Sequence, residues 1–304
     1  MPVMALSGEQ YTIAAGDHEA TVVEVGAALR RYTYRGGDVT QPFGTDEVAP
    51  HSTSAVLVPW PNRIRGGRYS FAGRDHQLPL SEPSRGHAVH GLARWVRWTA
   101  ASLEPAAITM TTDLVPQTGW PFEVRVEVSY VLTAAGLSVV AAARNHGATA
   151  APFGAGFHPY VALHGHRLDD VTLRVPAARR LVTDEAQIPV GEREVAGTEH
   201  DLRAGRRLGA LRLDDAFTGL SHEGGRGSAE VRVGGRGAGI WFDGAFRFLQ
   251  VFTSSFAGRP PAVAVEPMTC PADAFNSRTA LIVLEPGAEW TGSWGITPLV
   301  SIAD

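Results

Sequence analysis

The sequence predicts an all-β protein built as a large antiparallel β-sandwich with little helix. Apolar and polar residues alternate with a period of two over many short segments, the pattern of strands that bury one face. The 34 glycines and 20 prolines fall mainly between those segments, where tight turns need them. No window combines an apolar period of 3.6 with capping residues, so no long helix is expected.

The clearest strand is expected over residues 122–132, where apolar residues alternate with polar and charged ones. The four residues that follow, Thr-Ala-Ala-Gly at 133–136, predict a hairpin turn. A second strand, antiparallel to the first, is therefore expected over residues 137–144.

A central strand is expected over residues 246–252. This segment is apolar on both faces apart from Arg247 and Gln250, which is typical of a strand covered on each side. Many antiparallel strands in a chain of this length favour a sandwich over a small barrel. Further strands are expected at 21–25, 29–34, 68–71, 94–100, 108–114, 171–175, 230–233, 240–242, 281–284 and 291–296.

Chain length and composition favour one domain. At 304 residues the chain could hold one large β domain or two average ones. Hydrophobic residues make up 44% of the sequence and charged residues 19%, so a sizeable core can form. No internal repeat, low-complexity linker or shift in composition marks a boundary, and a single domain over residues 1–304 is expected.

Charge and cysteine content indicate which binding partners and which cellular compartment to expect. The formal net charge is −4, from 27 basic and 31 acidic residues with no long run of either sign, so we expect no nucleic-acid partner. The first ten residues lack the basic and apolar regions of a signal peptide, and no stretch of about 18 apolar residues predicts a membrane span. Cys270 is the only cysteine, which favours a reducing compartment, and a cytoplasmic location is expected.

His158 and Glu266 are the leading candidates for catalytic residues. His158 follows a small, apolar, glycine-containing run, and Glu266 ends the apolar run Ala-Val-Ala-Val at 262–265. Burial in such segments shifts the pKa of a titratable group, and acid–base chemistry near neutral pH needs shifts of this kind. Gly154 and Gly156 allow the backbone to approach its neighbours closely before His158.

Each of the two residues also has a structural interpretation. A histidine in a glycine-rich connection is often a hydrogen-bonded structural residue. The carboxylate of Glu266 could instead form a salt bridge, for instance to Arg278 or Arg259.

Two further segments carry candidate binding residues. Asn62 and Arg63 offer several directional donors side by side, which suits sugar hydroxyls, although a stiff turn is the alternative. His87 and His90 are three apart, but a zinc site needs a third ligand, so no metal is expected. His90, followed by a glycine, is the better candidate for a hydrogen-bonding pocket residue, and His87 for a structural one.

Asp214 and Asp215 place two acids before an aromatic residue. Adjacent aspartates at a turn most often cap a helix or form an Asx-turn. If one of them points inward, it could accept hydrogen bonds from a pair of sugar hydroxyls, and the sequence leaves open which one does. Most of the seven tryptophans are expected in the core, although one could stack on a sugar face.

Taken in chain order, these segments resemble the aldose 1-epimerase (mutarotase) family. Each motif is weak alone, but the ordered set spans roughly residues 56 to 277. The matching elements are Asn62-Arg63-Ile64 with Gly67, Tyr69, Phe71 and Gly73; His90-Gly91 with Trp98; Gly156-Phe157-His158-Pro159-Tyr160; Asp214 with Phe217; and Glu266 with Pro271, Asp273, Ala274 and Asn276.

The resemblance implies a galactose mutarotase-like supersandwich that holds a monosaccharide in a cleft on one sheet. By this similarity, Glu266 is the general base that takes the proton of the anomeric hydroxyl, and His158 is the general acid that protonates the ring oxygen. Arg63, His90, Asp214 and Asn62 are then substrate-binding residues. The resemblance implies no metal and no organic cofactor.

Several choices stay open at this level. The chain has Pro159-Tyr160-Val161-Ala162 after the histidine, where galactose mutarotases usually have two aromatics and an asparagine, so the sugar is undetermined. A hexose-6-phosphate 1-epimerase is the alternative for an anionic substrate, with Arg65, Arg68 and Arg94 as candidate rim cations. A non-catalytic sugar-binding protein is the other alternative. The protein is expected to be a monomer or a homodimer.

Overall fold

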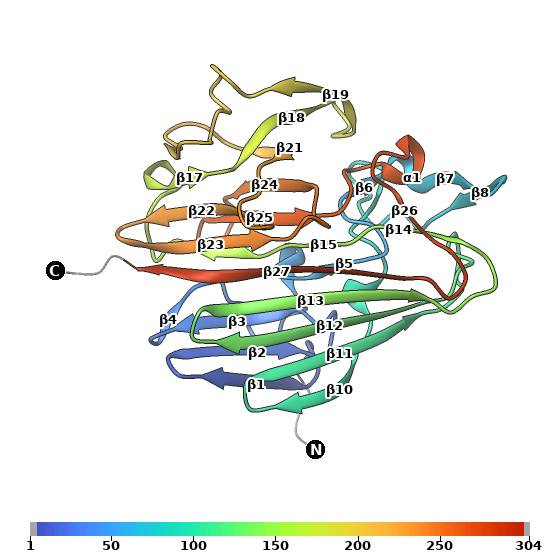
Figure 1. The fold of residues 1–304 in the computed structure, drawn as a ribbon, viewed down its shortest axis with the longest axis horizontal. Coiled ribbons are helices and arrows are strands. Elements are labelled where there is room, and N and C mark those ends of the chain that lie inside the picture. Colours follow the sequence, from blue (N-terminus) through green and yellow to red (C-terminus); the bar gives the residue numbers. More distant parts are fainter. Residues whose placement is uncertain (1–4, 301–304) are drawn as a thin grey trace.

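The computed structural model describes residues 5–300. Its largest element is a nine-stranded antiparallel sheet, which crosses the middle and lower part of Figure 1. In spatial order the strands are β10 (Thr99–Glu104), β11 (Ala107–Leu114), β12 (Val124–Thr133), β13 (Gly136–Asn145), β27 (Glu289–Val300), β23 (Arg236–Phe242), β22 (Gly227–Val233), β17 (Thr172–Arg174) and β20 (Arg206–Arg207).

A second antiparallel sheet, of eight strands, carries the functional site described below. Its strands in spatial order are β19 (Pro189–Glu194), β18 (Ala177–Thr183), β21 (Asp214–Leu220), β24 (Phe248–Ser254), β25 (Ala262–Met268), β15 (Gly156–Phe157) and β5 (Val56–Leu57), and β16 (Tyr160–Ala162) also pairs with β25.

Smaller elements complete the fold. A four-stranded sheet near the N-terminus packs against β11 and β12, as the blue and green ribbons of Figure 1 show. The remaining elements are β1 (Gln10–Ala15), β2 (His18–Val23), β3 (Leu29–Tyr34) and β4 (Gly37–Asp38) in that sheet; the pairs β6 (Arg63–Ile64) with β9 (Ala88–Val89), β7 (Arg68–Phe71) with β8 (Arg74–Gln77), and β14 (Ala151–Phe153) with β26 (Ile282–Leu284); and the short helix α1 (Ala274–Ser277).

The core forms as the alternation predicts. In β12, Val124, Val126 and Val128 are buried, whereas the residues between them are exposed. The turn at 133–136 joins β12 to β13 in the expected hairpin register, in which Thr133 pairs with Gly136. The predicted all-β antiparallel sandwich is confirmed.

The predicted central strand is also confirmed. β24 lies between β21 and β25, and all but one of its seven residues are buried. A polar side chain on such a strand can be accommodated only where it finds a partner, and Gln250 finds one in the functional site.

One predicted strand and one turn interpretation are wrong. A strand was expected over residues 94–100, but the segment opens as a 3-10 turn at Ala93–Trp95, and β10 starts only at Thr99. The side chain of Arg94 is buried in this turn, so it does not lie on the polar face of a strand. Asp214 and Asp215 do not cap a turn either, because they are the first two residues of β21.

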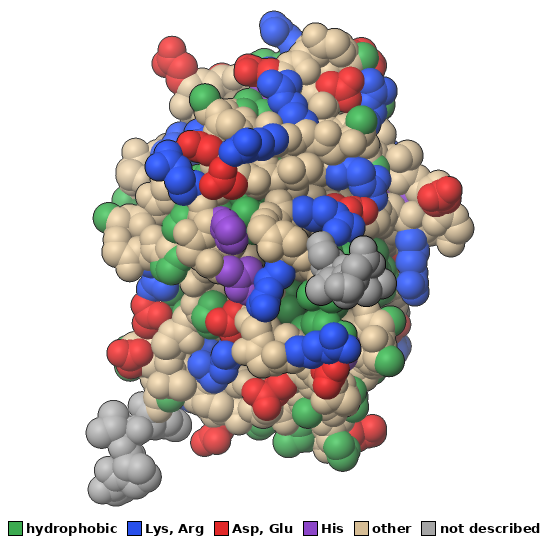
Figure 2. All heavy atoms as spheres, turned by 90° about the vertical axis from the view of Figure 1, so that its left-hand side faces the viewer, with side chains coloured by type: hydrophobic (Ala, Val, Ile, Leu, Met, Phe, Trp, Pro, Cys, Tyr) green, Lys and Arg blue, Asp and Glu red, His purple; other side chains and the backbone are tan. Residues whose placement is uncertain are grey.

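The surface agrees with the charge pattern of the sequence. Figure 2 shows acidic and basic side chains interspersed on one face of the molecule. None of the helices among residues 5–300 is long and apolar enough to cross a membrane.

Candidate functional site

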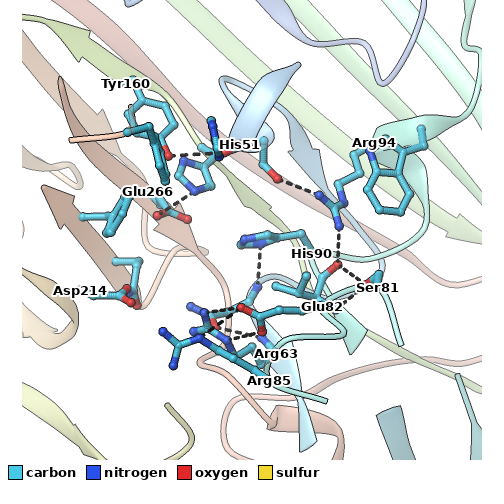
Figure 3. A pocket seen from close by; sticks show the side chains of 18 residues that line it. His51, Arg63, Ser81, Glu82, Arg85, His90, Arg94, Tyr160, Asp214 and Glu266 are labelled. Atoms are coloured by element: carbon cyan, nitrogen blue, oxygen red, sulfur yellow. Dashed lines mark hydrogen bonds and ion pairs between the residues drawn. The ribbon is translucent and has the colours of Figure 1, made fainter. Parts of the chain in front are cut away.

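A cavity of about 340 Å³ lies over the eight-stranded sheet, as Figure 3 shows from close by. Its walls come from β21, β24 and β25, from the connection between β15 and β16, and from the segments around residues 51–52 and 62–95. All six residues predicted for the site line this one cavity: Asn62, Arg63, His90, His158, Asp214 and Glu266.

Strand register places the acidic residues. Gln250 of β24 lies opposite Glu266 of β25, and Ala216 of β21 lies opposite Gln250. Because side chains alternate between the two faces of a strand, Asp214 lies on the same face as Ala216 and therefore on the same face as Glu266. One sheet face thus presents Asp214, Gln250 and Glu266 to the cavity.

His158 reaches the same place from the connection between β15 and β16. Both strands pair with β25, since Gly156 lies opposite Met268 and Tyr160 lies opposite Ala264. This pairing puts the imidazole beside the carboxyl group of Glu266, with 3.3 Å between His158 Nε2 and Glu266 Oε1.

The glycines before His158 have the predicted role of allowing close approach. A Cβ added to Gly156 would lie 2.7 Å from Cβ of Pro61, and one added to Gly154 would lie 2.5 Å from Sγ of Cys270. Side chains at either position would push the segment that carries His158 away from its neighbours.

Burial controls the electrostatics of the pair. His158 is 6% exposed and Glu266 is 2% exposed. Desolvation lowers the pKa of His158 to about 3 and raises the pKa of Glu266 well above its ordinary value. The charge of Asp214 raises the pKa of Glu266 further, and Arg63 acts in the opposite direction.

The structural interpretation of Glu266 is not supported. Arg278 donates to the backbone carbonyl of Ser70, and Arg259 pairs with Glu47. Among the described residues His158 is the charge partner of Glu266, and the second oxygen of Glu266, Oε2, is buried with no hydrogen-bond partner. A buried carboxyl oxygen without a partner is unusual for a residue with a purely structural role.

Arg63 is held in a fixed orientation at the cavity wall. Its Nε and Nη2 donate to the two carboxylate oxygens of Glu82 at 2.7 and 2.9 Å. The side-chain oxygen of Asn62 accepts from the backbone N–H of Arg63 at 2.9 Å and from Nη1 at 3.4 Å. Asn62 therefore contacts Arg63 directly, in addition to lining the cavity.

His90 has a defined tautomer. The backbone N–H of Asn62 donates to Nδ1 of His90 at 3.2 Å, so the ring proton belongs on Nε2. Burial lowers the pKa of His90 well below its ordinary value, and His158 adds to this shift. The neutral His90 ring can therefore donate a hydrogen bond through Nε2.

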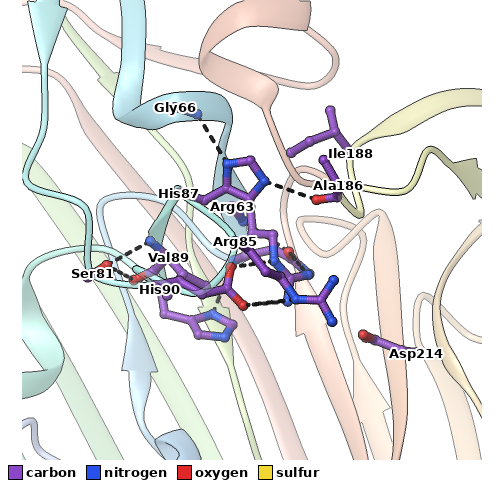
Figure 4. Close-up of polar contacts among 12 residues, drawn as sticks. Arg63, Gly66, Ser81, Arg85, His87, Val89, His90, Ala186, Ile188 and Asp214 are labelled. Carbon is purple, nitrogen blue, oxygen red and sulfur yellow. Dashed lines mark hydrogen bonds and ion pairs between the residues drawn. The ribbon is translucent and has the colours of Figure 1, made fainter.

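His87 lies outside the cavity lining, in line with its predicted structural role. Its Nδ1 accepts from the backbone N–H of Gly66 at 3.1 Å, and its Nε2 lies 3.0 Å from the carbonyl oxygen of Ala186, as Figure 4 shows. Both ring nitrogens are thus used to join two loops. Among residues 5–300, no three His, Cys, Asp or Glu residues form a cluster that could hold a metal ion.

The two adjacent aspartates lie on opposite faces of β21. Asp214 lines the cavity and accepts a hydrogen bond from Nε2 of Gln250 at 2.7 Å. Asp215 forms an ion pair with Arg180 on the other face of the strand, with 2.8 Å between Oδ1 and Nη1. Asp214 is therefore the one of the two that faces the site.

Several lining residues were not predicted for the site. Glu82 holds Arg63, but the sequence around Glu82 does not indicate this role, because only the tertiary fold brings the two residues together. Gln250 was visible as a polar residue in an apolar strand. Of the three candidate rim arginines, Arg94 lines the cavity, whereas Arg65 and Arg68 bond to other residues outside it.

The sequence profile of the family described as aldose 1-epimerase matches residues 9–297. The chain belongs to the aldose 1-epimerase family. As a family member it is a carbohydrate epimerase, an isomerase. It is 33% identical to the uncharacterized protein YihR of Escherichia coli K12 over 285 residues, which cover 93% of this chain and 91% of YihR.

Two further comparisons show what this aldose 1-epimerase family member is similar to. It is 30% identical to the galactose mutarotase of Mus musculus over 173 residues, which cover 55% of this chain and 50% of the mouse protein. The structure of a GalM/aldose epimerase homologue from C. elegans superposes with a TM-score of 0.85 at 19% identity, covering 96% of this chain and 99% of that one.

Proposed function

We propose that the protein interconverts the α and β anomers of an aldose by acid–base opening and closing of the ring. The observation that carries this proposal is the contact at 3.3 Å between the buried side chains of Glu266 and His158 in one cavity. The two oxygens that exchange protons in a cyclic hemiacetal, the anomeric hydroxyl and the ring oxygen, are bonded to the same carbon. A base and an acid that lie side by side can therefore each reach one of them.

Glu266 acts as the base in this proposal and His158 as the acid. The carboxylate takes the proton of the anomeric hydroxyl, and the imidazolium donates a proton to the ring oxygen as the bond from the anomeric carbon to the ring oxygen breaks. The open-chain aldehyde then rotates about the bond between its first two carbons. The two proton transfers run in reverse, and the ring closes as the other anomer.

The pKa shifts fit this exchange. Because burial raises the pKa of Glu266 and lowers that of His158, the pair holds one proton between the two titrations. The neutral form, with the proton on the carboxyl group, and the ionic form, with the proton on the imidazole, contain the same number of protons. Hydrogen bonds from a bound sugar and the charge of Arg63 favour the ionic form that starts the reaction.

The remaining lining residues suit the sugar hydroxyls. Arg63 and the Nε2–H of His90 supply donors, Asp214 supplies an acceptor, and Asn62 orients Arg63. No residue role in this scheme calls for a metal or an organic cofactor. A non-catalytic sugar-binding protein would not need a buried acid–base pair in its cavity, so the enzymatic role is favoured.

Anomer exchange measured by NMR on a panel of aldoses tests the proposal. Wild-type protein is expected to accelerate exchange of at least one aldose, and Glu266→Gln and His158→Asn are each expected to lower kcat by roughly 100- to 10,000-fold. Thermal unfolding of both variants serves as the folding control. Full activity in both folded variants would remove the two assignments, and no acceleration of any aldose would remove the proposed function.

A further inference from the structure

Arg94 is a buried cation in the wall of the cavity. Its side chain comes from the 3-10 turn at Ala93–Trp95 and the residue is only 9% exposed. Nη1 donates to Oγ of Ser52 at 2.9 Å and Nη2 donates to the carbonyl oxygen of Val89 at 3.3 Å, while Nε is buried with no hydrogen-bond partner. The two partners that the guanidinium has are both uncharged.

The other two arginines that line the cavity share one counter-ion. Glu82 pairs with Arg63 at 2.7 Å and with Arg85 at 3.5 Å. Among residues 5–300, no carboxylate forms an ion pair with Arg94. Burial lowers the pKa of Arg94 to about 10, so the guanidinium still carries its charge at neutral pH.

A buried charge without a counter-ion is unfavourable, and a fold keeps one where a ligand supplies the opposite charge. The guanidinium is also fixed in orientation, because its central carbon lies 3.8 Å from the centre of the Trp95 ring. A planar, held guanidinium presents its N–H groups in the arrangement that an oxyanion accepts.

The position of Arg94 fits one end of a bound sugar. In Figure 3, Arg94 and Asp214 lie on opposite sides of His90, with Glu266 on the side of Asp214. Arg94 is close enough to the reacting groups for its charge to contribute to lowering the pKa of both His90 and His158. One end of the cavity therefore holds Asp214 and Glu266, and the other holds a cation that feels the charge of Glu82 but forms no ion pair with it.

We infer that the aldose carries an anionic substituent, such as a phosphate, sulfonate or carboxylate group, and that Arg94 binds it. This inference rests on the proposed function and narrows its substrate class. Arg94 contributes to the affinity for the charged sugar and neither donates nor accepts a proton itself.

A comparison of neutral and charged aldoses tests this inference. Anomer exchange is measured by NMR at fixed ionic strength for glucose, glucose 6-phosphate, 6-deoxyglucose 6-sulfonate and glucuronate. Wild type is expected to show a kcat/KM at least about 10-fold higher on one of the charged sugars than on glucose. Arg94→Met is expected to lower the value for the preferred charged sugar about 10- to 100-fold more than it lowers the value for glucose. The three charged sugars distinguish the three oxyanion groups.

Arg94→Lys and Arg97→Met are the companion variants. Lysine keeps the charge but loses the planar group, so an intermediate loss on the charged sugar is expected. Arg97 is an exposed arginine outside the cavity that pairs with Glu24, and its replacement is expected to leave both substrates unaffected. A wild-type preference for glucose over all three charged sugars would overturn the inference even if Arg94→Met did not fold. An equal effect of Arg94→Met on both classes would also overturn it.

Binding of methyl glycosides separates this inference from the proposed function. Methyl glucoside and its 6-phosphate, 6-sulfonate and uronate counterparts cannot change anomer, so calorimetry reports binding alone. A charged glycoside that binds at least about 10-fold tighter than methyl glucoside, with the difference lost in Arg94→Met, would support the inference even if no aldose were turned over. Equal binding of all four would overturn it while leaving the proposed mutarotation intact.

Discussion

Oε1 of Glu266 lies 3.3 Å from Nε2 of His158, and desolvation moves the pKa values of the two groups in opposite directions. The carboxyl group therefore holds its proton to higher pH, and the imidazole accepts one only at lower pH. Two groups that interact at this distance titrate as a pair, and the proposed mutarotation needs the state with one proton.

The pH profile of kcat/KM is expected to be a broad plateau across neutral pH. On the acid side activity falls when a second proton binds, and because burial lowers the pKa of His158 to about 3, this limb lies far below the ordinary imidazole value of 6.5. On the alkaline side activity falls when the last proton leaves, and the raised pKa of Glu266 puts this limb well above the ordinary carboxyl value of 4.5. NMR exchange rates from about pH 4 to about pH 9 check the profile. A single acid limb near 6.5 would show that a free imidazole controls the rate.

Asp214 and Asp215 are expected to respond in opposite ways to replacement by asparagine. Asp214→Asn removes the acceptor charge that faces the cavity and is expected to raise KM about 10-fold or more with little change in stability. Asp215→Asn breaks the pair with Arg180 on the other face and is expected to leave KM unchanged. Steady-state kinetics and urea unfolding of the two variants check both statements. Equal effects on KM would contradict the placement of the two side chains.

The adjacent aspartates also show how far the sequence predicts this site. Their composition and the family resemblance pointed to Asp214, but the sequence left open which of the two faces the cavity. The choice follows once Asp214–Leu220 is known to be a strand, because neighbouring side chains then point to opposite faces. The turn interpretation failed because adjacent aspartates favour turns by local hydrogen bonding, and pairing with β24 outweighs that preference here.

The strands of the core were predictable for a simpler physical reason. The hairpin of β12 and β13 combines strict alternation with a glycine at the turn, and both signals are local. The segment 94–100 lacks this strict alternation, since Trp95 and Val96 are adjacent apolar residues, and it opens with a turn that buries Arg94 against Ser52. The ion pair between Arg63 and Glu82 could not be predicted either, because the residues next to Arg63 do not indicate that Glu82 is its partner.

The ion pair between Arg63 and Glu82 is expected to support both stability and binding. The side chains are 13% and 19% exposed, so Glu82→Gln leaves a largely buried guanidinium without its counter-ion. The free energy of unfolding is expected to fall by about 1–3 kcal/mol, and KM is expected to rise because Arg63 is no longer held. Urea unfolding and steady-state kinetics measure the two effects.

The exposed pair of Arg35 and Asp17 serves as the control for that variant. Its side chains are 66% and 57% exposed, so solvent screens the pair and Asp17→Asn is expected to leave the free energy of unfolding nearly unchanged. If Glu82→Gln were as mild as Asp17→Asn in both measurements, the pair at the cavity wall would have no positioning role.

Gly91, directly after His90, is expected to tolerate no side chain. Its φ is +69°, a conformation that costs an L-residue about 1–2 kcal/mol, and an added Cβ would lie 2.0 Å from the carbonyl oxygen of Val58. Gly91→Ala is therefore expected to lower the free energy of unfolding by more than the cost of the positive φ alone. It is also expected to raise KM, because the backbone beside His90 must shift. Gly73 has a φ of +75° with nothing within 4 Å of an added Cβ, so the loss of stability in Gly73→Ala measures the cost of the positive φ without a clash. Urea unfolding of the two variants gives the comparison, and equal losses of stability would mean that the contact with Val58 relaxes without cost.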